Sequence, residues 1–210
     1  MADLADLPSD ITPEQFFTEV LPEVLGEIES LPDGLGTERM QFNITGPGGG
    51  EYNLGIDPNE GQGIEGLTIE EGQATRPPIC VTASVADFQS LLAGDLRDKV
   101  RDATGGLLIG PKQLRKAFMP DAKVQKIKTV SGDVQLRLEA GGQATVVTIT
   151  FGGNPPNTAA PRCKVSLGMP AIMEMAQKKA NPQQLFMQGK IRMDGDMSIV
   201  LQLMGMLAQP

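Results

Sequence analysis

The sequence predicts an α+β fold built from two related lobes, each with a sheet covered by helices. Apolar residues recur at helical spacing near the N-terminus, and they alternate with polar residues in several later segments. Part of this order then returns in the second half of the chain. At 210 residues, the chain could form one large domain or two small ones. A fold of this size buries roughly 70% of its unfolded surface, so it needs no disulfide or metal for stability.

The first helix is expected directly after a flexible tail at residues 1–11. Thr12 and Gln15 form a capping-box pattern, and Pro13 occupies the first helical position, where its missing N–H has no partner to lose. Pro22 falls within the apolar pattern that follows. Because proline cannot donate its backbone hydrogen bond, we expect the helix to kink or split there.

Four strands are expected after this helix. Their alternating patterns lie at residues 40–44, 52–56, 64–69 and 79–83. The glycine-rich stretch 46–50 separates the first two strands, and no helix opens after it. It therefore predicts a hairpin turn rather than a phosphate-binding loop. Ser84 is then positioned to cap a helix that runs to about residue 96.

Several of these features return in the second half of the chain. Alternation predicts a hairpin over residues 134–151, and PPICVTASVADFQSLL at 77–92 parallels APRCKVSLGMPAIMEMA at 160–176. In both stretches, proline precedes a cysteine-bearing strand and a capped helix. A repeat of this length predicts two tandem lobes, at residues 12–96 and 124–210. The alternative is a single domain in which residues 97–160 form a long insertion.

Residues 97–123 are predicted to be a basic helical connector, with an apolar face formed by Leu107, Leu108, Leu114 and Phe118. Residues 97–128 hold nine bases and three acids, whereas residues 1–71 hold sixteen acids and one base. These charges would either steer the two parts of the chain together or allow transient contact with an anionic membrane surface. Nucleic acid is not expected as a partner, because the net charge is −8 and aromatic residues are scarce.

The composition argues against most kinds of catalysis. The chain contains no histidine, which excludes histidine-based triads, general bases and metal ligands. Cys80 and Cys163 are too few for a disulfide framework, and we expect both to be buried and reduced. No paired acids or activated nucleophile stand at a recognisable spacing. We therefore expect a protein that is not an enzyme and has no cofactor or metal. The N-terminus also lacks the features of a signal peptide, which favours the cytoplasm.

The last stretch carries the most specific pattern in the chain. Phe186-x-x-Gly189-Lys190 precedes a short strand-like run, and an apolar segment then extends from Met197 to Leu207. Asp196 or Ser198 is positioned to cap this segment as a helix. A helix that is apolar on every side is expected to be buried, and this one is too short to cross a bilayer. It would form either a core helix or the wall of an apolar cavity.

Phe186, Gly189, Lys190, Gly195 and Met197, with the apolar helix behind them, resemble the closing motif of the sterol carrier protein type 2 (SCP-2) family. The order of elements over residues 12–96 also resembles the front of that domain. The resemblance implies an SCP-2-like fold, with a mainly antiparallel, five-stranded type of sheet covered by helices. It also implies an apolar tunnel, closed by the C-terminal helix, that holds a fatty acid, acyl ester, sterol or isoprenoid.

On this resemblance, the protein would be a non-catalytic carrier of a lipid or another hydrophobic small molecule. The candidate ligand-binding residues are Met169, Ile172, Met173, Met175, Phe186, Met187, Gly189, Lys190, Met197, Leu201, Met204 and Leu207. Gly189 is included because a Cβ there would intrude on a close backbone approach, and Lys190 because it would anchor a carboxylate or phosphate. The alternative is an interaction or assembly module that keeps the fold but has closed its cavity.

Overall fold

The computed structural model describes residues 7–61, 63–104, 114–115 and 117–207. The strands are β1 (Met40–Thr45), β2 (Gly50–Ile56), β3 (Leu67–Glu71), β4 (Ile79–Ser84), β5 (Gly132–Ala140), β6 (Gln143–Phe151), β7 (Cys163–Gly168) and β8 (Ile191–Gly195). The helices are α1 (Pro13–Gln15), the π-helical turn η2 (Phe16–Val20), α2 (Leu21–Gly26), the 3-10 turn η3 (Ile64–Gly66), α3 (Val85–Ala93), α4 (Asp95–Thr104), α6 (Asp121–Lys128), α7 (Met169–Ala176), α8 (Pro182–Met187) and α9 (Met197–Leu207).

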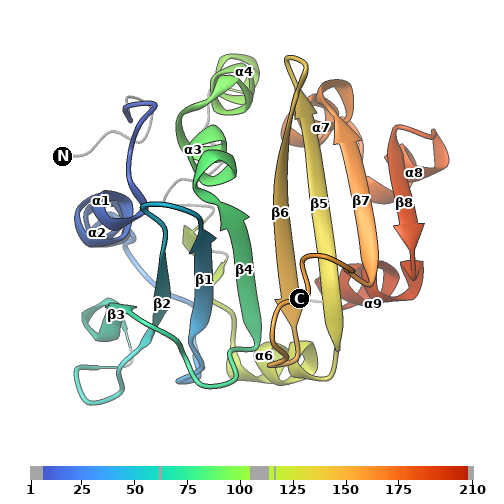
Figure 1. The fold of residues 1–210 in the computed structure, drawn as a ribbon. Helices are drawn as coiled ribbons and strands as arrows, with labels where there is room; N and C mark the ends of the chain where they lie inside the picture. Colours follow the sequence, from blue (N-terminus) through green and yellow to red (C-terminus); the bar gives the residue numbers. More distant parts are fainter. Residues whose placement is uncertain (1–6, 62, 105–113, 116, 208–210) are drawn as a thin grey trace.

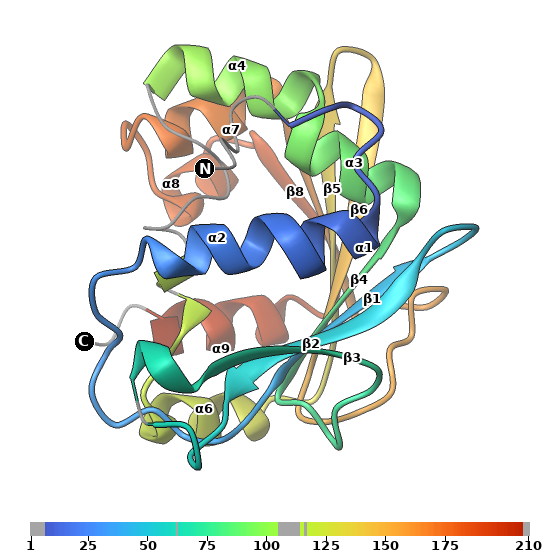
Figure 2. The same cartoon turned by 90° about the vertical axis from the view of Figure 1, so that its left-hand side faces the viewer.

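The described strands form one eight-stranded sheet in the order β3-β2-β1-β4-β6-β5-β7-β8. Figures 1 and 2 show the helices gathered on one face of this sheet, so the molecule has two layers. The α+β class is thus confirmed. The expectation of a five-stranded sheet is wrong, because strands from the two halves of the chain pair with each other.

The same strand pairing occurs twice along the sheet. In the first half, β1 pairs antiparallel with β2 and parallel with β4. In the second half, β5 pairs antiparallel with β6 and parallel with β7. The halves differ at their outer ends, where β3 lies beyond β2 and β8 lies beyond β7. The repeated pattern agrees with the internal repeat in the sequence, whereas the proposed lobe boundaries stay a prediction.

The two halves join where β4 pairs antiparallel with β6, from Ile79↔Phe151 to Ala83↔Val147. Each of these strands would otherwise expose a row of unpaired backbone N–H and C=O groups. By pairing, they remove two free edges and make the sheet continuous. This pairing explains why the second half needs no third strand of its own.

The N-terminal helix begins and divides as its sequence predicts. The Thr12 hydroxyl accepts a hydrogen bond from the backbone N–H of Gln15, and the Gln15 side chain accepts one from Thr12, which completes the capping box. Pro22 has no N–H, and its ring excludes a normal carbonyl position one turn earlier. The chain accommodates it with the π-helical turn η2, in which the N–H of Leu21 donates to the carbonyl of Phe16.

Two of the predicted element boundaries are different in the structure. The third strand begins at Leu67 rather than at residue 64, because the 3-10 turn η3 precedes it. The helix capped by Ser84 ends at Ala93, and α4 begins at Asp95 after Gly94. A Cβ on Gly94 would lie 2.6 Å from the carbonyl oxygen of Ser90, so glycine is required at this break.

The helix-facing side of the sheet holds two apolar clusters. One surrounds Phe17 in the first half, and the other surrounds Ile199 in the second half. Leu91 and Ile149 pack against both clusters, which therefore form one continuous apolar layer between the sheet and the helices. Burial of this layer from water is the main source of stability for a fold of this kind.

The opposite face of the sheet holds buried polar side chains, which form hydrogen bonds with loop residues. Gln41 and Asn53 are both buried, and both donate side-chain hydrogen bonds to the carbonyl oxygen of Gly72. In the second half, buried Asp133 accepts a hydrogen bond from the backbone N–H of Asn157. The loops that precede β4 and β7 thus satisfy polar groups that would be costly to bury alone.

Several basic residues of the stretch 97–128 bind groups of this same chain. Arg97 is buried and donates to the carbonyl oxygens of Leu7 and Leu92. Arg115 donates to the carbonyl oxygen of Ser30, 2.6 Å away. Lys128 forms an ion pair with Glu38, also at 2.6 Å. These contacts favour the view that the basic stretch steers the two parts of the chain together, whereas membrane contact through residues 97–128 stays a prediction.

The apolar face predicted for the connector can be followed only in part. Leu114 and Phe118 pack against the first apolar cluster, whereas Leu107 and Leu108 lie outside the described residues. Within the described part of the chain, no helix is both long and apolar enough to cross a membrane.

The two cysteines occupy opposite faces of the sheet. Cys80 lies beside Gln41 on the polar face, whereas Cys163 belongs to the apolar cluster around Ile199. Side chains alternate between faces along a strand, so the one-residue offset of the cysteines between the two repeats is enough to separate them. Both are buried, as expected from the sequence, and both are free thiols.

We expect both thiols to react slowly in the folded protein. Burial raises the pKa of Cys163, and it raises the pKa of Cys80 from 9.0 to about 11. Because the thiolate is the reactive form, Cys80 should label roughly a hundred times more slowly at pH 8 than in the unfolded chain. Timed alkylation followed by mass spectrometry measures this rate. Equal rates in the presence and absence of denaturant would contradict the burial of both residues.

Candidate functional site

An apolar pocket lies between the sheet and the helices, where the two halves of the chain meet. We call it the junction pocket. Its sheet wall is formed by Met40 at the start of β1, Ile56 at the end of β2 and Ile79 at the start of β4. Helix α6 supplies Val124 and Ile127 from the other half of the chain. Both halves are therefore needed to form this pocket.

Segment 34–36 holds one side of the junction pocket close to the start of α6. The N–H of Asp121 donates to the carbonyl oxygen of Gly34 at 2.8 Å, and Leu35 forms an isolated β-bridge with Pro120. A Cβ on Gly36 would lie 2.5 Å from the Asp121 carboxylate, so a larger residue would require this side chain to move. The backbone contact brings Leu35 into the pocket wall beside Phe118.

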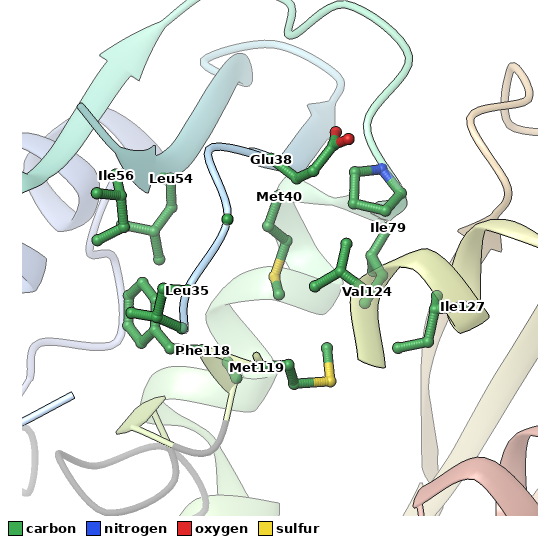
Figure 3. A pocket seen from close by; sticks show the side chains of 14 residues that line it. Leu35, Glu38, Met40, Leu54, Ile56, Ile79, Phe118, Met119, Val124 and Ile127 are labelled. Atoms are coloured by element: carbon green, nitrogen blue, oxygen red, sulfur yellow. The ribbon is translucent and has the colours of Figure 1, made fainter. Parts of the chain in front are cut away.

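Side chains in the junction pocket converge from several elements. Figure 3 shows Leu35, Met40, Leu54, Ile56, Ile79, Phe118, Met119, Val124 and Ile127 around one apolar space. The space has a volume of about 50 Å³. This volume holds only a few water molecules and is well below the roughly 300 Å³ at which typical small-molecule sites begin. A long ligand could enter only if some of these side chains moved.

Met40 and Met119 are the lining side chains best able to move. Methionine is unbranched and has three rotatable bonds, so it changes rotamer at little cost. Both residues are half-buried rather than locked in the core. At the rim of the pocket, Glu38 pairs with Lys128, so the pocket has an apolar interior and a charged edge.

A second hollow, the edge groove, lies at the far end of the sheet. It runs between the N-terminal helix and strands β2 and β3, and its volume is about 410 Å³. Phe17, Leu25 and Tyr52 form its floor, while Leu67 and Ile69 form its outer wall. The groove is larger than the junction pocket and more open to solvent, and Glu71 lies at its edge.

The structure places the predicted residues of α7 in the core of the second half. Ile172 is buried, and Met169, Met173 and Met175 are half-buried against the apolar cluster around Ile199. These four residues lie on the helix side of the sheet, as a cavity wall would require. They do not contribute to the junction pocket or to the edge groove.

The residues predicted around α8 are exposed. The exposed fraction is 38% for Phe186 and 80% for Met187. Gly189 and Lys190 line a polar hollow of about 320 Å³ together with Glu139 and Arg192. The Lys190 ammonium is already 2.6 Å from the carboxylate of Glu174.

The structure shows a backbone reason for glycine at residue 189. Apart from its chain neighbours, no described residue has an atom within 4 Å of the position where the Gly189 Cβ would be built. The close approach expected at this residue would therefore be that of a ligand, and it stays a prediction. The Gly189 φ of +71° lies in the left-handed region, which glycine adopts at no cost. Glycine is therefore required by the turn after α8, in which the N–H of Gly189 donates to the carbonyl of Phe186.

Helix α9 is buried on one side only, so the expectation that it is buried all round is wrong. Ile199 and Leu203 face the core, whereas Met197 and Leu201 are exposed by 43% and 60%. The predicted Met204 is half-buried, and the side chain of Leu207 lies outside the described residues.

Asp196 rather than Ser198 caps helix α9. Its carboxylate accepts a hydrogen bond from the backbone N–H of Ser198 at 2.9 Å and pairs with Arg162 at 2.7 Å. Hydrogen bonds from Ser198, followed by the one from Arg162, lower the pKa of Asp196 to about 2. The cap is therefore ionised at neutral pH, and it links the start of α9 to the residue before β7.

Sequence reasoning missed the residues of the junction pocket. They come from segments far apart in the chain, and each fits the apolar pattern of an ordinary strand or helix. Only Phe118 had been singled out, as part of the connector's apolar face. The available signal was the pair of methionines, Met40 and Met119, which lie outside the methionine-rich stretch near the C-terminus.

Comparison with known proteins identifies the family of the second half. Residues 112–208 match the model of the SCP-2 sterol transfer family. The resemblance based on the closing motif is therefore confirmed, because this segment matches the model of that family. The matched segment includes α6, the strands β5 to β8 and helix α9, and thus one wall of the junction pocket. No curated protein matches the chain.

Several solved structures are similar to this chain at low sequence identity. Sterol carrier protein 2-like 2 from Aedes aegypti is 18% identical with a TM-score of 0.31, over 40% of this chain and 91% of that chain. Sterol carrier protein 2 from Yarrowia lipolytica, in its apo form, is 20% identical with a TM-score of 0.32, over 56% and 91%. The palmitated form of the Aedes aegypti protein gives 19% identity and a TM-score of 0.31, over 42% and 94%.

Proposed function

We propose that the protein binds a lipid or another long apolar ligand without reacting with it, and that the hydrocarbon occupies the junction pocket. The family of residues 112–208 supports lipid binding as the general activity. The single observation that carries the location is the apolar lining of this pocket, which both halves of the chain supply. The charged rim at Glu38 and Lys128 would receive the polar end of the ligand.

Entry of a ligand would require the pocket to expand. Met40 and Met119 would change rotamer and give up their place to the hydrocarbon chain. Burial of apolar surface stabilises a complex by roughly 25 cal/mol per Å², so a long chain would supply enough free energy for micromolar binding. We further propose that the protein acts in the cytoplasm, where its two free thiols would stay reduced.

A second candidate function is an interaction module with a closed cavity. The small volume of the junction pocket, about 50 Å³, is the observation that favours it. In that case the apolar lining would simply be the core between the two halves, and no lipid would bind.

We expect Met119→Trp to weaken binding of a fluorescent fatty acid at least tenfold, because the larger ring would fill the junction pocket. The matched control is Leu67→Trp, which places the same ring in the edge groove and should leave the affinity unchanged. Titration of the fatty acid followed by fluorescence anisotropy measures both. If Leu67→Trp weakened binding and Met119→Trp did not, the ligand would occupy the edge groove instead. No binding by the unaltered protein would instead support the closed module.

A further inference from the structure

The most exposed large apolar side chain among the described residues lies at the end of α8. Met187 is 80% exposed and Phe186 is 38% exposed, whereas the neighbouring Leu185 is fully buried. Leu185 thus anchors the short helix while the two residues after it project into solvent. Exposed apolar side chains that lie next to each other and are rimmed by polar residues can mark an interaction surface, whereas a single exposed apolar residue is ordinary.

The backbone around Met187 is held by several hydrogen bonds. Asn181 and Gln184 form a capping box at the start of α8. At its end, the N–H of Lys190 donates to the carbonyl of Leu185 at 2.9 Å. The projection of Met187 is therefore a fixed feature of the fold, not the result of a loose terminus.

Exposed basic residues flank this projection along the chain. Lys178 and Lys179 precede α8, Lys190 follows it, and Arg192 is the second residue of β8; all four are exposed. The N–H of Lys179 donates to the carbonyl of Glu174, and the Lys190 ammonium contacts the carboxylate of the same residue. The backbone of Lys179 and the side chain of Lys190 thus both contact Glu174, so the segments before and after α8 lie close together. We call Phe186, Met187, Lys178, Lys179, Lys190 and Arg192 the α8 patch.

The fold converts the charge asymmetry of the sequence into an asymmetry in space. Residues 1–71 hold sixteen acids and one base, and they supply the strands at the β3 end of the sheet. Residues 174–192 hold four bases and one acid, and they lie at the opposite end, beside β8 (Figure 1). An anionic surface would therefore repel one end of the molecule and attract the other.

We propose that the α8 patch docks on the surface of an anionic phospholipid bilayer. Phe186 and Met187 enter the boundary between headgroups and acyl chains, while Lys178 and Lys179 contact phosphate and carboxylate groups. The bilayer is favoured over an acidic protein because Met187 projects outward. A protein partner would need a complementary pocket for this side chain, whereas the interface of a fluid bilayer can accommodate it without one. Docking does not depend on a ligand in the junction pocket, so the two proposals can fail separately.

The absence of tryptophan from the chain provides a direct test. Met187→Trp places a sole tryptophan in the α8 patch, and Thr75→Trp places one on an exposed loop in the acidic half. With the full chain and vesicles of phosphatidylcholine and phosphatidylserine at low salt, the emission of Met187→Trp should shift to the blue and that of Thr75→Trp should not. No shift at residue 187, or an equal shift at both positions, would overturn the proposal.

Charge variants test the basic residues of the α8 patch. Lys178→Glu combined with Lys179→Glu should reduce co-sedimentation of the otherwise unaltered protein with the same vesicles at least tenfold. The matched control, Lys123→Glu with Lys126→Glu, makes the same charge change in the basic stretch 97–128 and should leave binding within about twofold. Equal losses in both double variants would show that net charge alone matters, and would overturn the assignment to α8.

Discussion

Phe17→Ala is expected to destabilise the protein by about 3–5 kcal/mol, the usual cost of removing a buried phenyl ring. Phe17 is 2% exposed and stacks on Tyr52 with ring centroids 4.3 Å apart. Its ring also lies 5.2 Å from Phe42, 5.3 Å from Phe16 and 5.9 Å from Phe88. No other aromatic residue in the described part of the chain contacts as many rings, so the loss of Phe17 would leave a cavity that its closely packed neighbours cannot fill.

Urea unfolding monitored by circular dichroism measures this loss of stability. The control is Glu19→Ala, two residues away on the exposed side of the same turn, which should change the free energy of unfolding by less than about 0.5 kcal/mol. A loss below about 1 kcal/mol for Phe17→Ala would show that the cluster repacks and is not the centre of this core.

The same measurement tests how the two halves depend on each other. Because β4 and β6 pair along the middle of one sheet, we expect a single transition whose midpoint falls in Phe17→Ala. Two transitions, of which only one responds to the substitution, would instead show that residues 12–96 and 124–210 unfold as separate lobes.

Much of the fold could be predicted from sequence because its signals are local. The capping box at Thr12, the division at Pro22 and the two hairpins each depend on residues close together in the chain. The pairing of β4 with β6 has no such signal. It depends on two strands whose paired residues are more than sixty positions apart and which would each have one unpaired edge. Neither strand contains a local pattern that identifies the other as its partner.

The candidate site was harder to predict for the same physical reason. Periodicity identifies which face of a helix is buried only when the other face is polar, and α9 is apolar on both. The sequence therefore could not tell that Ile199 and Leu203 face inward while Met197 and Leu201 face solvent. A pocket between elements is likewise a property of their packing, so residues such as Ile56 and Val124 were indistinguishable from core.

Gly195→Ala is expected to destabilise the protein by at least about 2 kcal/mol, although it adds only one methyl group. Gly195 has a φ of +98°, which L-residues rarely adopt, and a Cβ there would lie 2.5 Å from the backbone oxygen of Arg162. That oxygen also accepts the N–H of Asp196, which caps α9. The backbone cannot move away without giving up this hydrogen bond and the pairing of Gly195 with Cys163.

The matched control for this substitution is Gly205→Ala, which should have the opposite sign. Gly205 lies within α9, and no atom lies within 4 Å of the position of its Cβ. Alanine there should stabilise the protein by about 0.5–1 kcal/mol, because glycine loses more conformational entropy in a helix. Thermal unfolding of the two variants compares them directly. If Gly195→Ala were neutral, the glycine of the Gly-x-Met pattern would not be needed to join β8 to α9. The match of Gly195 to the SCP-2 closing motif would then not reflect any requirement of the backbone of this chain.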